Sequence, residues 1–341
     1  MNRQPDPTAI LQTATAFWPA KVLLTAVGLG VFTTLGKKSM TAEELGKALG
    51  LHPRGWYDFF DALVALKFLE RDGDGPGGRY RNTVDTGTFL DKASPAYIGG
   101  LAEMLNSRLF RFWGELETAL KTGKPQNEIK DGETSMFSKL YADPARLGTF
   151  LEAMSGFQGG NFMALAEKFD FGRYKTVTDV GGALALLSRI VGARYQHVAF
   201  KSFDLPEVAP HAQKHVDAAR MGDRIKVVSG DFFKDALPKA DVVTMGNILH
   251  DWNLPNKKIL IKKAYEALPQ GGAFIAVENV IDDARRENAF GLMMSLNMLI
   301  EFGDAFDYTG AEFRSWCTEA GFKRFEFLQL TGPTSAAIAY K

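Results

Sequence analysis

Five short apolar runs follow one another in the second half of the chain, and helical segments separate them. The runs are rich in β-branched or aromatic residues and span 177–180, 198–203, 225–228, 242–245 and 273–278. Strands that alternate with helices form open, mostly parallel sheets. The expected fold class of this half is therefore α/β.

The first 165 residues have a different, mainly helical pattern. Thr41 and Glu44 have the spacing of a capping box that opens a helix, and a second helix begins near His52. Two short extended runs, 68–71 and 79–82, then flank a glycine-rich turn. This order is typical of a winged helix. We therefore expect two domains, 1–165 and 166–341.

Polar residues stand where the predicted strands end, which is where open parallel sheets bind ligands. Glycines after the first strand let backbone N–H groups approach a nucleotide closely. A carboxylate after the second strand can accept hydrogen bonds from a ribose diol. A carboxylate beside an aromatic ring can hold and stack an adenine. The strand-end residues are, in chain order, Asp179, Gly181, Gly182, Asp204, Asp231, Phe232, Asn247, His250 and Glu278.

Composition excludes several other classes of function. Lysine plus arginine and aspartate plus glutamate both number 40, so the net charge of zero argues against a nucleic-acid or membrane-surface partner. The helix at 53–68 carries only Arg54 and Lys67 as basic residues, which makes DNA binding by the winged helix unexpected. One cysteine, Cys317, excludes an intrachain disulfide and a cysteine metal cluster. We find no signal peptide and no run of 18 apolar residues, so we expect a soluble, cytoplasmic protein.

Two histidines, His211 and His215, are spaced to share a helix face, but no third ligand accompanies them. A metal site is therefore not expected. The N-terminal half is rich in large apolar side chains, more than a small helical domain can cover alone. This predicts a homodimer with a hydrophobic interface. The side chains concerned are Trp56, Phe59, Phe60, Phe110, Phe112 and Trp113.

Four motifs carry a resemblance to a known family over nearly the whole chain. They are Phe203-Asp-Leu-Pro206, Gly230-Asp-Phe-Phe233, Ile248-Leu-His-Asp-Trp252 and Ala267-Leu-Pro-Gln-Gly-Gly272. The chain resembles the plant-type small-molecule O-methyltransferases, which join a winged-helix dimerisation domain to a Rossmann-like class I methyltransferase domain. The resemblance implies S-adenosylmethionine as methyl donor, S-adenosylhomocysteine as product, no metal, and a homodimer that acts on a small-molecule acceptor.

The resemblance also implies roles for individual residues. His250 corresponds to the family's general base, and Glu278 and Asp307 correspond to the two carboxylates that hold it. Asp204 would bind the ribose, and Asp231 with Phe232 the adenine. The expected cofactor-binding residues are Asp179, Gly181, Gly182, Asp204, Leu205, Asp231, Phe232 and Asn247.

The expected acceptor-binding residues are Arg108, Met294, Asn297 and Met298. Each also has a purely structural interpretation. Methionines at helical spacing most often fill a core, and an arginine beside aromatic residues most often lies on a solvated helix face. A pocket-facing Arg108 would suit an acceptor that carries a carboxylate.

The chain departs from the family pattern after the first strand, where Ala183 and Ala185 stand in place of glycine. Each methyl group narrows the approach to the cofactor, so a cofactor-binding pseudoenzyme is one alternative function. Asp307 is also shorter than the glutamate of plant members.

The acceptor atom is open to two interpretations. The presence of His250 favours a hydroxyl, which must lose a proton, whereas a thioether needs no base. The segment 288–301 and the two alanines also resemble the bacterial S-methyltransferases called DsyB. These enzymes methylate 4-methylthio-2-hydroxybutyrate on the route to dimethylsulfoniopropionate. We expect this S-methylation first, with O-methylation of a hydroxylated aromatic or secondary metabolite as the alternative.

Overall fold

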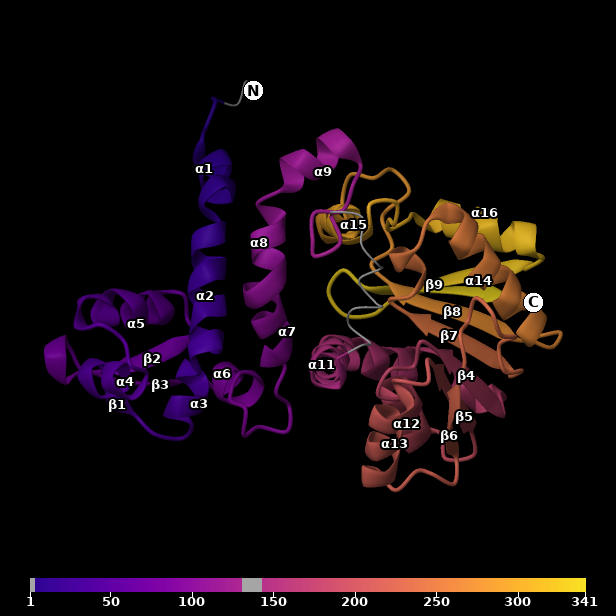
Figure 1. Ribbon diagram of the computed structural model, residues 1–341, viewed down its shortest axis with the longest axis horizontal. Coiled ribbons are helices and arrows are strands. Elements are labelled where there is room, and N and C mark those ends of the chain that lie inside the picture. Colours follow the sequence, from indigo (N-terminus) through magenta and orange to yellow (C-terminus); the bar gives the residue numbers. More distant parts are fainter. Residues whose placement is uncertain (1–3, 131–142) are drawn as a thin grey trace. The chain divides into compact units, whose positions relative to one another are not determined.

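The computed structural model describes residues 4–130 and 143–341. The chain divides into two compact units, Met1–Arg111 and Phe112–Lys341, shown in Figure 1. This division lies earlier than the domain boundary at 165 that the sequence pattern predicts. Helix α11 (Pro144–Lys168) packs against helix α12 (Leu186–Arg194), which covers the sheet of the second unit. Helix α11 therefore belongs with the second unit. The domain limits 1–165 and 166–341 themselves stay a prediction.

The first unit has the predicted winged helix. Its helices include α1 (Thr8–Thr15), α2 (Phe17–Leu29), α3 (Val31–Leu35), α4 (Ala42–Ala48), η1 (Pro53–Gly55), α5 (Trp56–Ala65), η2 (Gly75–Gly77), α6 (Val84–Phe89), α7 (Gly99–Met104) and η3 (Leu105–Leu109). Its sheet has the order β1 (Met40–Thr41), β3 (Arg79–Asn82), β2 (Leu69–Asp72). The Thr41 and Glu44 side chains form the predicted capping box. Phe32, Phe60 and Tyr80 pack in the core between helices and wing.

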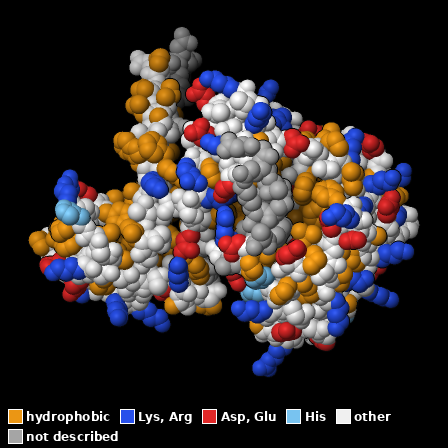
Figure 2. All heavy atoms as spheres, viewed as in Figure 1, with side chains coloured by type: hydrophobic (Ala, Val, Ile, Leu, Met, Phe, Trp, Pro, Cys, Tyr) orange, Lys and Arg blue, Asp and Glu red, His pale blue; other side chains and the backbone are white. Residues whose placement is uncertain are grey.

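The apolar surface of this unit differs from the sequence prediction. The large side chains that we expected this unit to leave uncovered, Trp56, Phe59, Phe60 and Phe110, are buried or half-buried instead, as are Phe112 and Trp113 at the start of the second unit. The indole of Trp56, for example, donates to the Leu51 carbonyl at 3.0 Å. Exposed apolar side chains lie on α1 and α2, where Ile10 is 72% and Trp18 is 61% exposed (Figure 2). The run Thr8–Leu29 is long and apolar enough to reach across a bilayer, by length and composition only.

The second unit contains a sheet of seven strands. Its order is β6 (Ile225–Ser229), β5 (Ala199–Asp204), β4 (Thr176–Val180), β7 (Val242–Gly246), β8 (Ala273–Glu278), β10 (Ser335–Tyr340) and β9 (Arg324–Gln329). The first five are parallel, and they are the five predicted runs. β10 is antiparallel to both of its neighbours. The α/β fold class with a Rossmann-like sheet is thereby confirmed.

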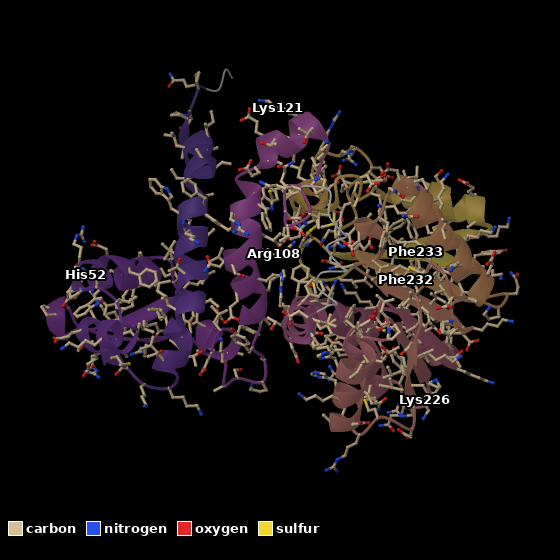
Figure 3. All side chains as sticks on the ribbon, in the orientation of Figure 1. His52, Arg108, Lys121, Lys226, Phe232 and Phe233 are labelled. Carbon is tan, nitrogen blue, oxygen red and sulfur yellow. The ribbon has the colours of Figure 1, made fainter. Side chains whose placement is uncertain are left out.

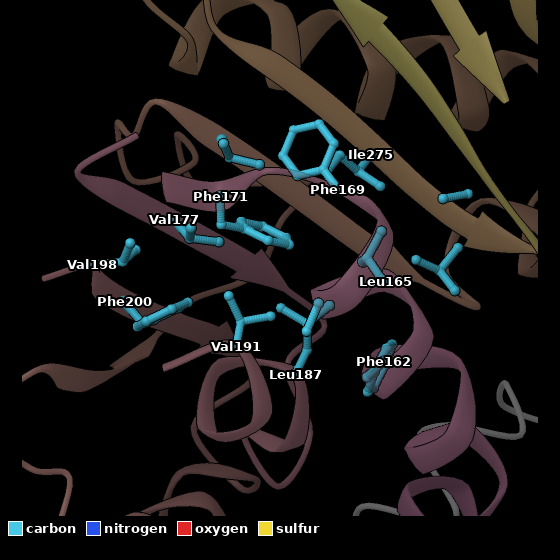
Figure 4. Packing of buried hydrophobic residues seen from close by; sticks show 14 of the residues in the cluster. Phe162, Leu165, Phe169, Phe171, Val177, Leu187, Val191, Val198, Phe200 and Ile275 are labelled. Atoms are coloured by element: carbon cyan, nitrogen blue, oxygen red, sulfur yellow. The ribbon is translucent and has the colours of Figure 1, made fainter. Parts of the chain in front are cut away.

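Helices cover both faces of this sheet, as Figure 1 shows. They are α11, α12, α13 (Ala209–Ala218), α14 (Leu254–Ala267) and α16 (Gly310–Ala320), with α9 (Leu116–Thr122), α15 (Ala289–Phe302), η4 (Phe171–Arg173) and η5 (Leu249–Asp251) around them. The short helix α8 (Phe110–Trp113) spans the boundary between the two units. Along β8, Ile275 and Val277 join the cluster beneath α11 and α12 (Figure 4), while Phe274 and Ala276 join the cluster beneath α14 and α16. Because side chains alternate along a strand, Glu278 continues the second series. It therefore faces the side on which η5 lies.

Candidate active site at the carboxyl ends of the strands

The turn after β4 has room for backbone only. Gly181 has a φ of +69°, and a methyl group there would collide with the Ile248 side chain. A methyl group on Gly182 would collide with the Ser202 hydroxyl. Both predicted glycines are thus required by close packing. The turn presents peptide groups at the edge of the sheet, which suits a nucleotide-type ligand.

The two alanines that replace glycine adopt left-handed backbone angles. Ala183 has a φ of +46° and Ala185 a φ of +54°. This region costs a residue with a Cβ atom roughly 1–2 kcal/mol. Two interactions stabilise this strained backbone conformation. The Ala185 methyl packs in the core, and the Ala183 N–H donates to the Asp204 carboxylate at 2.9 Å. The loop therefore keeps a conformation that glycine would adopt more easily.

Asp204 lies at the end of β5 beside this turn. Its other oxygen accepts a hydrogen bond from the Leu205 N–H at 2.8 Å. Burial raises the pKa of Asp204 to about 6. Each carboxylate oxygen has a second lone pair. The side chain is therefore fixed in place and still able to accept hydrogen bonds from a diol, which fits the predicted ribose site.

Asp231 and Phe232 follow β6. The Asp231 carboxylate accepts from the Phe233 N–H at 2.9 Å and lies 2.9 Å from the Lys234 ammonium. Burial opposes ionisation, but Lys234 and the backbone N–H group bring the pKa of Asp231 below its usual value. Phe232 and Phe233 (Figure 3) pack edge-on against the Trp252 ring, with centroids 5.9 and 4.6 Å away. These rings connect the predicted adenine site to the turn that carries His250.

Two further residues predicted to bind the cofactor have local structural roles. Asp179 is buried in β4, where it accepts from the Thr244 hydroxyl at 2.8 Å, and burial raises its pKa to about 7. Asn247 follows β7 with a φ of +52°, and its N–H donates to the Val277 carbonyl at 3.1 Å. Asparagine is one of the few residues other than glycine that tolerates this angle. Contact of either side chain with the cofactor stays a prediction.

His250 lies in η5 and is only 5% exposed. Its Nδ1 atom lies 3.3 Å from the Asp307 carboxylate, and its Nε2 atom lies 3.4 Å from the Asp251 carboxylate. Burial alone would lower the pKa of His250, but Asp307 and Asp251 outweigh burial and raise it to about 10. A carboxylate at Nδ1 fixes the orientation of the imidazole and stabilises its protonated form. Once this imidazole has lost its proton, it can accept one from a bound hydroxyl.

Glu278, the second predicted partner of His250, holds the backbone of η5 rather than the ring. One carboxylate oxygen accepts from the N–H groups of Ile248, Leu249 and His250, at 3.2, 2.8 and 3.2 Å. Burial raises the pKa of Glu278. The structure thus brings His250, Glu278 and Asp307 together, with a different task for each carboxylate.

Sequence reasoning gave no role to two charged residues of this cluster: Asp251, which it used only as part of the motif that contains His250, and Lys257. Lys257 is fully buried and donates to the Trp252 carbonyl. Its position could have been found from the spacing of Lys257, Leu260, Ile261 and Ala264, which places the lysine on the apolar face of α14.

The expected acceptor residues separate into three groups. On α15, which packs against η5, Met298 is buried and Met294 is half-buried. The Asn297 amide oxygen accepts from the Trp113 indole at 2.9 Å. Arg108 lies on η3 of the first unit (Figure 3), so its place at the acceptor site stays a prediction. Also on α15, Ser295 accepts a hydrogen bond from the Asp307 N–H at 3.2 Å, which connects this helix to the partner of His250.

Within residues 4–130 and 143–341, no group of three histidine, cysteine or acidic side chains is arranged to hold a metal ion. The described site is composed of carboxylates, the His250 imidazole, the ammonium groups of Lys234 and Lys257, aromatic rings and backbone N–H groups.

Comparison with known proteins agrees with this geometry. Residues 113–323 match the O-methyltransferase domain, and residues 11–92 match the O-methyltransferase dimerisation domain. The chain therefore belongs to this family of O-methyltransferases.

Its relatives extend over nearly the whole chain. It is 39% identical over 335 residues to the tetracenomycin polyketide synthesis 8-O-methyl transferase of Streptomyces glaucescens, covering 98% of this chain and 97% of that one. It is 34% identical over 316 residues to an N,N-dimethyltransferase of Streptomyces rimosus, covering 92% and 90%. The structure of human N-acetylserotonin methyltransferase in complex with SAM is similar, with a TM-score of 0.90, 26% identity, and 100% and 99% of the two chains covered. The protein is thus a methyltransferase that uses S-adenosylmethionine and acts on a small molecule, as predicted.

Proposed function

We propose that the protein is an O-methyltransferase that acts on a phenolic hydroxyl of an aromatic, polyketide-type metabolite, with His250 as general base. The observation that carries the proposal is the buried pair of His250 and Asp307, 3.3 Å apart. A base is needed only where the acceptor atom must lose a proton. The similarity to an enzyme of tetracenomycin polyketide synthesis supports the aromatic acceptor.

The residues of the chain contribute mainly alignment and proton removal. S-adenosylmethionine supplies a methyl group that is already activated on a sulfonium. The turn at Gly181 and Gly182, with Asp204 and Asp231, would hold this cofactor at the strand ends. His250 would take the hydroxyl proton, and Asp307 would stabilise the imidazolium that forms. Alignment and exclusion of water supply most of the remaining rate enhancement of a displacement of this kind.

S-methylation of 4-methylthio-2-hydroxybutyrate, the first expectation from the sequence, stays a prediction. A thioether sulfur has no proton to lose, so an imidazole held by Asp307 would have no proton to accept there. In that reaction His250 would only shape the pocket or bind the hydroxyl or carboxylate of the acceptor. The geometry therefore supports the oxygen acceptor better.

The decisive experiment combines an acceptor panel with His250→Asn. Purified protein and S-adenosylmethionine are incubated with polycyclic phenols and with thioether hydroxy acids, and methylated products are identified by mass spectrometry. We expect methylation of a phenol, and a fall in kcat of roughly 10²–10⁴-fold in His250→Asn. His197→Asn, which alters an exposed histidine, is the matched control.

Calorimetry with S-adenosylhomocysteine shows whether each variant still folds and binds cofactor. Methylation of the thioether acid alone, at an undiminished kcat in His250→Asn, would refute the proposal. Cofactor binding without turnover of any acceptor would instead indicate a pseudoenzyme.

A further inference from the structure

Gln158 carries a buried hydrogen-bond donor that no described residue uses. The side chain lies on α11 and is only 5% exposed. Its Nε2 atom is buried, and within residues 4–130 and 143–341 no group accepts a hydrogen bond from it. Buried polar groups are hydrogen-bonded in the great majority of folded proteins, so a donor of this kind beside a binding site indicates a contact with the ligand.

The orientation of the Gln158 amide is fixed by its neighbour Asn161. The Asn161 amide oxygen accepts from the N–H and the hydroxyl of Thr331, so its Nδ2 atom is the one that faces Gln158. This Nδ2 atom donates to the Gln158 Oε1 atom at 3.0 Å and to the Thr334 hydroxyl at 3.3 Å. Because Oε1 must face this donor, the Nε2 atom of Gln158 is left to donate elsewhere.

The position of Gln158 along α11 places it beside the turn after β4. Leu151, earlier on the same helix face, packs in a cluster with Leu184 of that turn. Phe162, one helical turn after Gln158, lies at the end of β7, where a methyl group on Gly246 would come within 3.1 Å of its ring. Since β4 and β7 are neighbours in the sheet, this face of α11 lies at the carboxyl ends of both strands.

The turn after β4 has few N–H groups to offer an anionic ligand. Those of Gly181 and Gly182 donate to a carbonyl of β5. The Ala183 N–H donates to the Asp204 carboxylate. Residues 181–185 also contain no lysine or arginine. An anionic group held at this turn therefore needs a donor from another element, and α11 provides one.

S-adenosylmethionine ends in an amino-acid group that carries such an anion. The predicted adenine and ribose contacts, Asp231 and Asp204, follow β6 and β5, and β4 is the next strand of the sheet. A cofactor held by these two residues would have its amino-acid end at the turn after β4. An amide N–H suits the carboxylate of this end, because hydrogen bonds to an ionised group are stronger than those between neutral groups.

We propose that the Gln158 side chain binds the amino-acid carboxylate of S-adenosylmethionine through its Nε2 atom, and that Asn161 is the positioning residue that orients this amide. The inference concerns the cofactor alone. It therefore does not depend on which acceptor the enzyme methylates, and its test needs no turnover.

The test compares two ligands that differ only in this carboxylate. Binding of S-adenosylhomocysteine and of its decarboxylated analogue to the purified protein is measured by isothermal calorimetry, with competition where binding is weak. In Gln158→Met we expect S-adenosylhomocysteine to bind roughly tenfold to hundredfold more weakly, the scale of a lost hydrogen bond to a charged group. The decarboxylated analogue should bind as it does to the wild type.

Gln213→Met, at an exposed position of α13, is the matched control and should leave both affinities unchanged. Thermal unfolding shows whether each variant folds, and Gln158→Leu takes the place of Gln158→Met if the latter does not. Unchanged affinity for both ligands, or an equal fall for both, would overturn the proposal. An unchanged cofactor affinity with a raised KM for the acceptor would also overturn it, and would assign the Gln158 donor to the acceptor.

Discussion

Glu278 accepts a hydrogen bond from the backbone N–H of His250 at 3.2 Å, and no hydrogen bond joins its carboxylate to the imidazole in the described structure. The ring faces Asp307 instead. The two buried carboxylates therefore support the same residue at two levels, one at the main chain and one at the side chain. Substitutions of Glu278 and Asp307 should consequently have different effects.

The pH dependence of the reaction should reveal the His250–Asp307 pair. Because the pKa of His250 is raised to about 10, most molecules carry the protonated imidazole at neutral pH. For a hydroxyl acceptor, kcat should rise about tenfold per pH unit until it nears that pKa. Asp307→Asn removes the charge that raises the pKa of His250 most. The rise of kcat with pH should therefore shift to lower pH, while the maximum kcat at high pH falls. If kcat of Asp307→Asn rises over the same pH range as in the wild type, the ionisation belongs to the acceptor and not to His250.

Asp204 should contribute to cofactor affinity. Its carboxylate is fixed by two backbone N–H groups and remains able to accept from a diol. Asp204→Ala should weaken binding of S-adenosylhomocysteine by roughly 1.5–3 kcal/mol, the scale of lost hydrogen bonds to a charged group. Isothermal calorimetry measures this, with Asp223→Ala at an exposed turn as the control. Unchanged affinity in Asp204→Ala would place the ribose elsewhere.

The strained turn makes a stability prediction. Ala183→Gly relieves a left-handed alanine and should raise the free energy of unfolding by about 0.5–1 kcal/mol, because the relief exceeds the entropy cost of glycine. Ala185→Gly should raise the free energy of unfolding by less, because it also removes a methyl group from the core. Ala218→Gly, at an exposed position of α13, should lower the free energy of unfolding by up to about 1 kcal/mol. Denaturant titration distinguishes these outcomes, and a loss in Ala183→Gly would show that the turn is unstrained.

The exposed apolar side chains of α1 and α2 should lie at an interface between two copies of the chain. Patches of this kind on a free surface mark association sites, and the chain carries a dimerisation domain. Light scattering should give twice 37.5 kDa for the wild type. Trp18→Glu should shift the mass toward the monomer, whereas Ile259→Glu, at an exposed site on α14, should not. A monomeric wild type at micromolar concentration would exclude this interface.

The sequence predicted the parallel part of the sheet well, because its strands carry β-branched or aromatic residues and the three central strands β4, β7 and β8 are buried on both faces. It did not reveal β10, whose sequence Ser-Ala-Ala-Ile-Ala-Tyr has weak strand propensity. Pairing with β8 and β9 on either side determines that strand. Tertiary context explains this miss.

The same limit applies at the site and on the surface. The resemblance to the family identified both residues, since His250 stands in a motif that follows β7 and Asp307 lies in the segment between α15 and α16. Lys257 was not predicted to belong to the site, because a lysine is ordinarily interpreted as a surface residue. Its burial depends on carboxylates from three other segments. The burial of large aromatic side chains was also misjudged, because Phe60 and Phe112, which the sequence suggested as interface residues, lie in the interior.

The hydrogen bond between Ser295 and the Asp307 backbone has a consequence for the evolution of acceptor preference. Substitutions on α15 that reshape the space around Met294 also move the helix on which the carboxylate facing His250 depends. A substitution that admits a new acceptor should therefore also change the pKa of His250. Selection for one property alters the other, so enzymes of this design should diverge in acceptor and in working pH together.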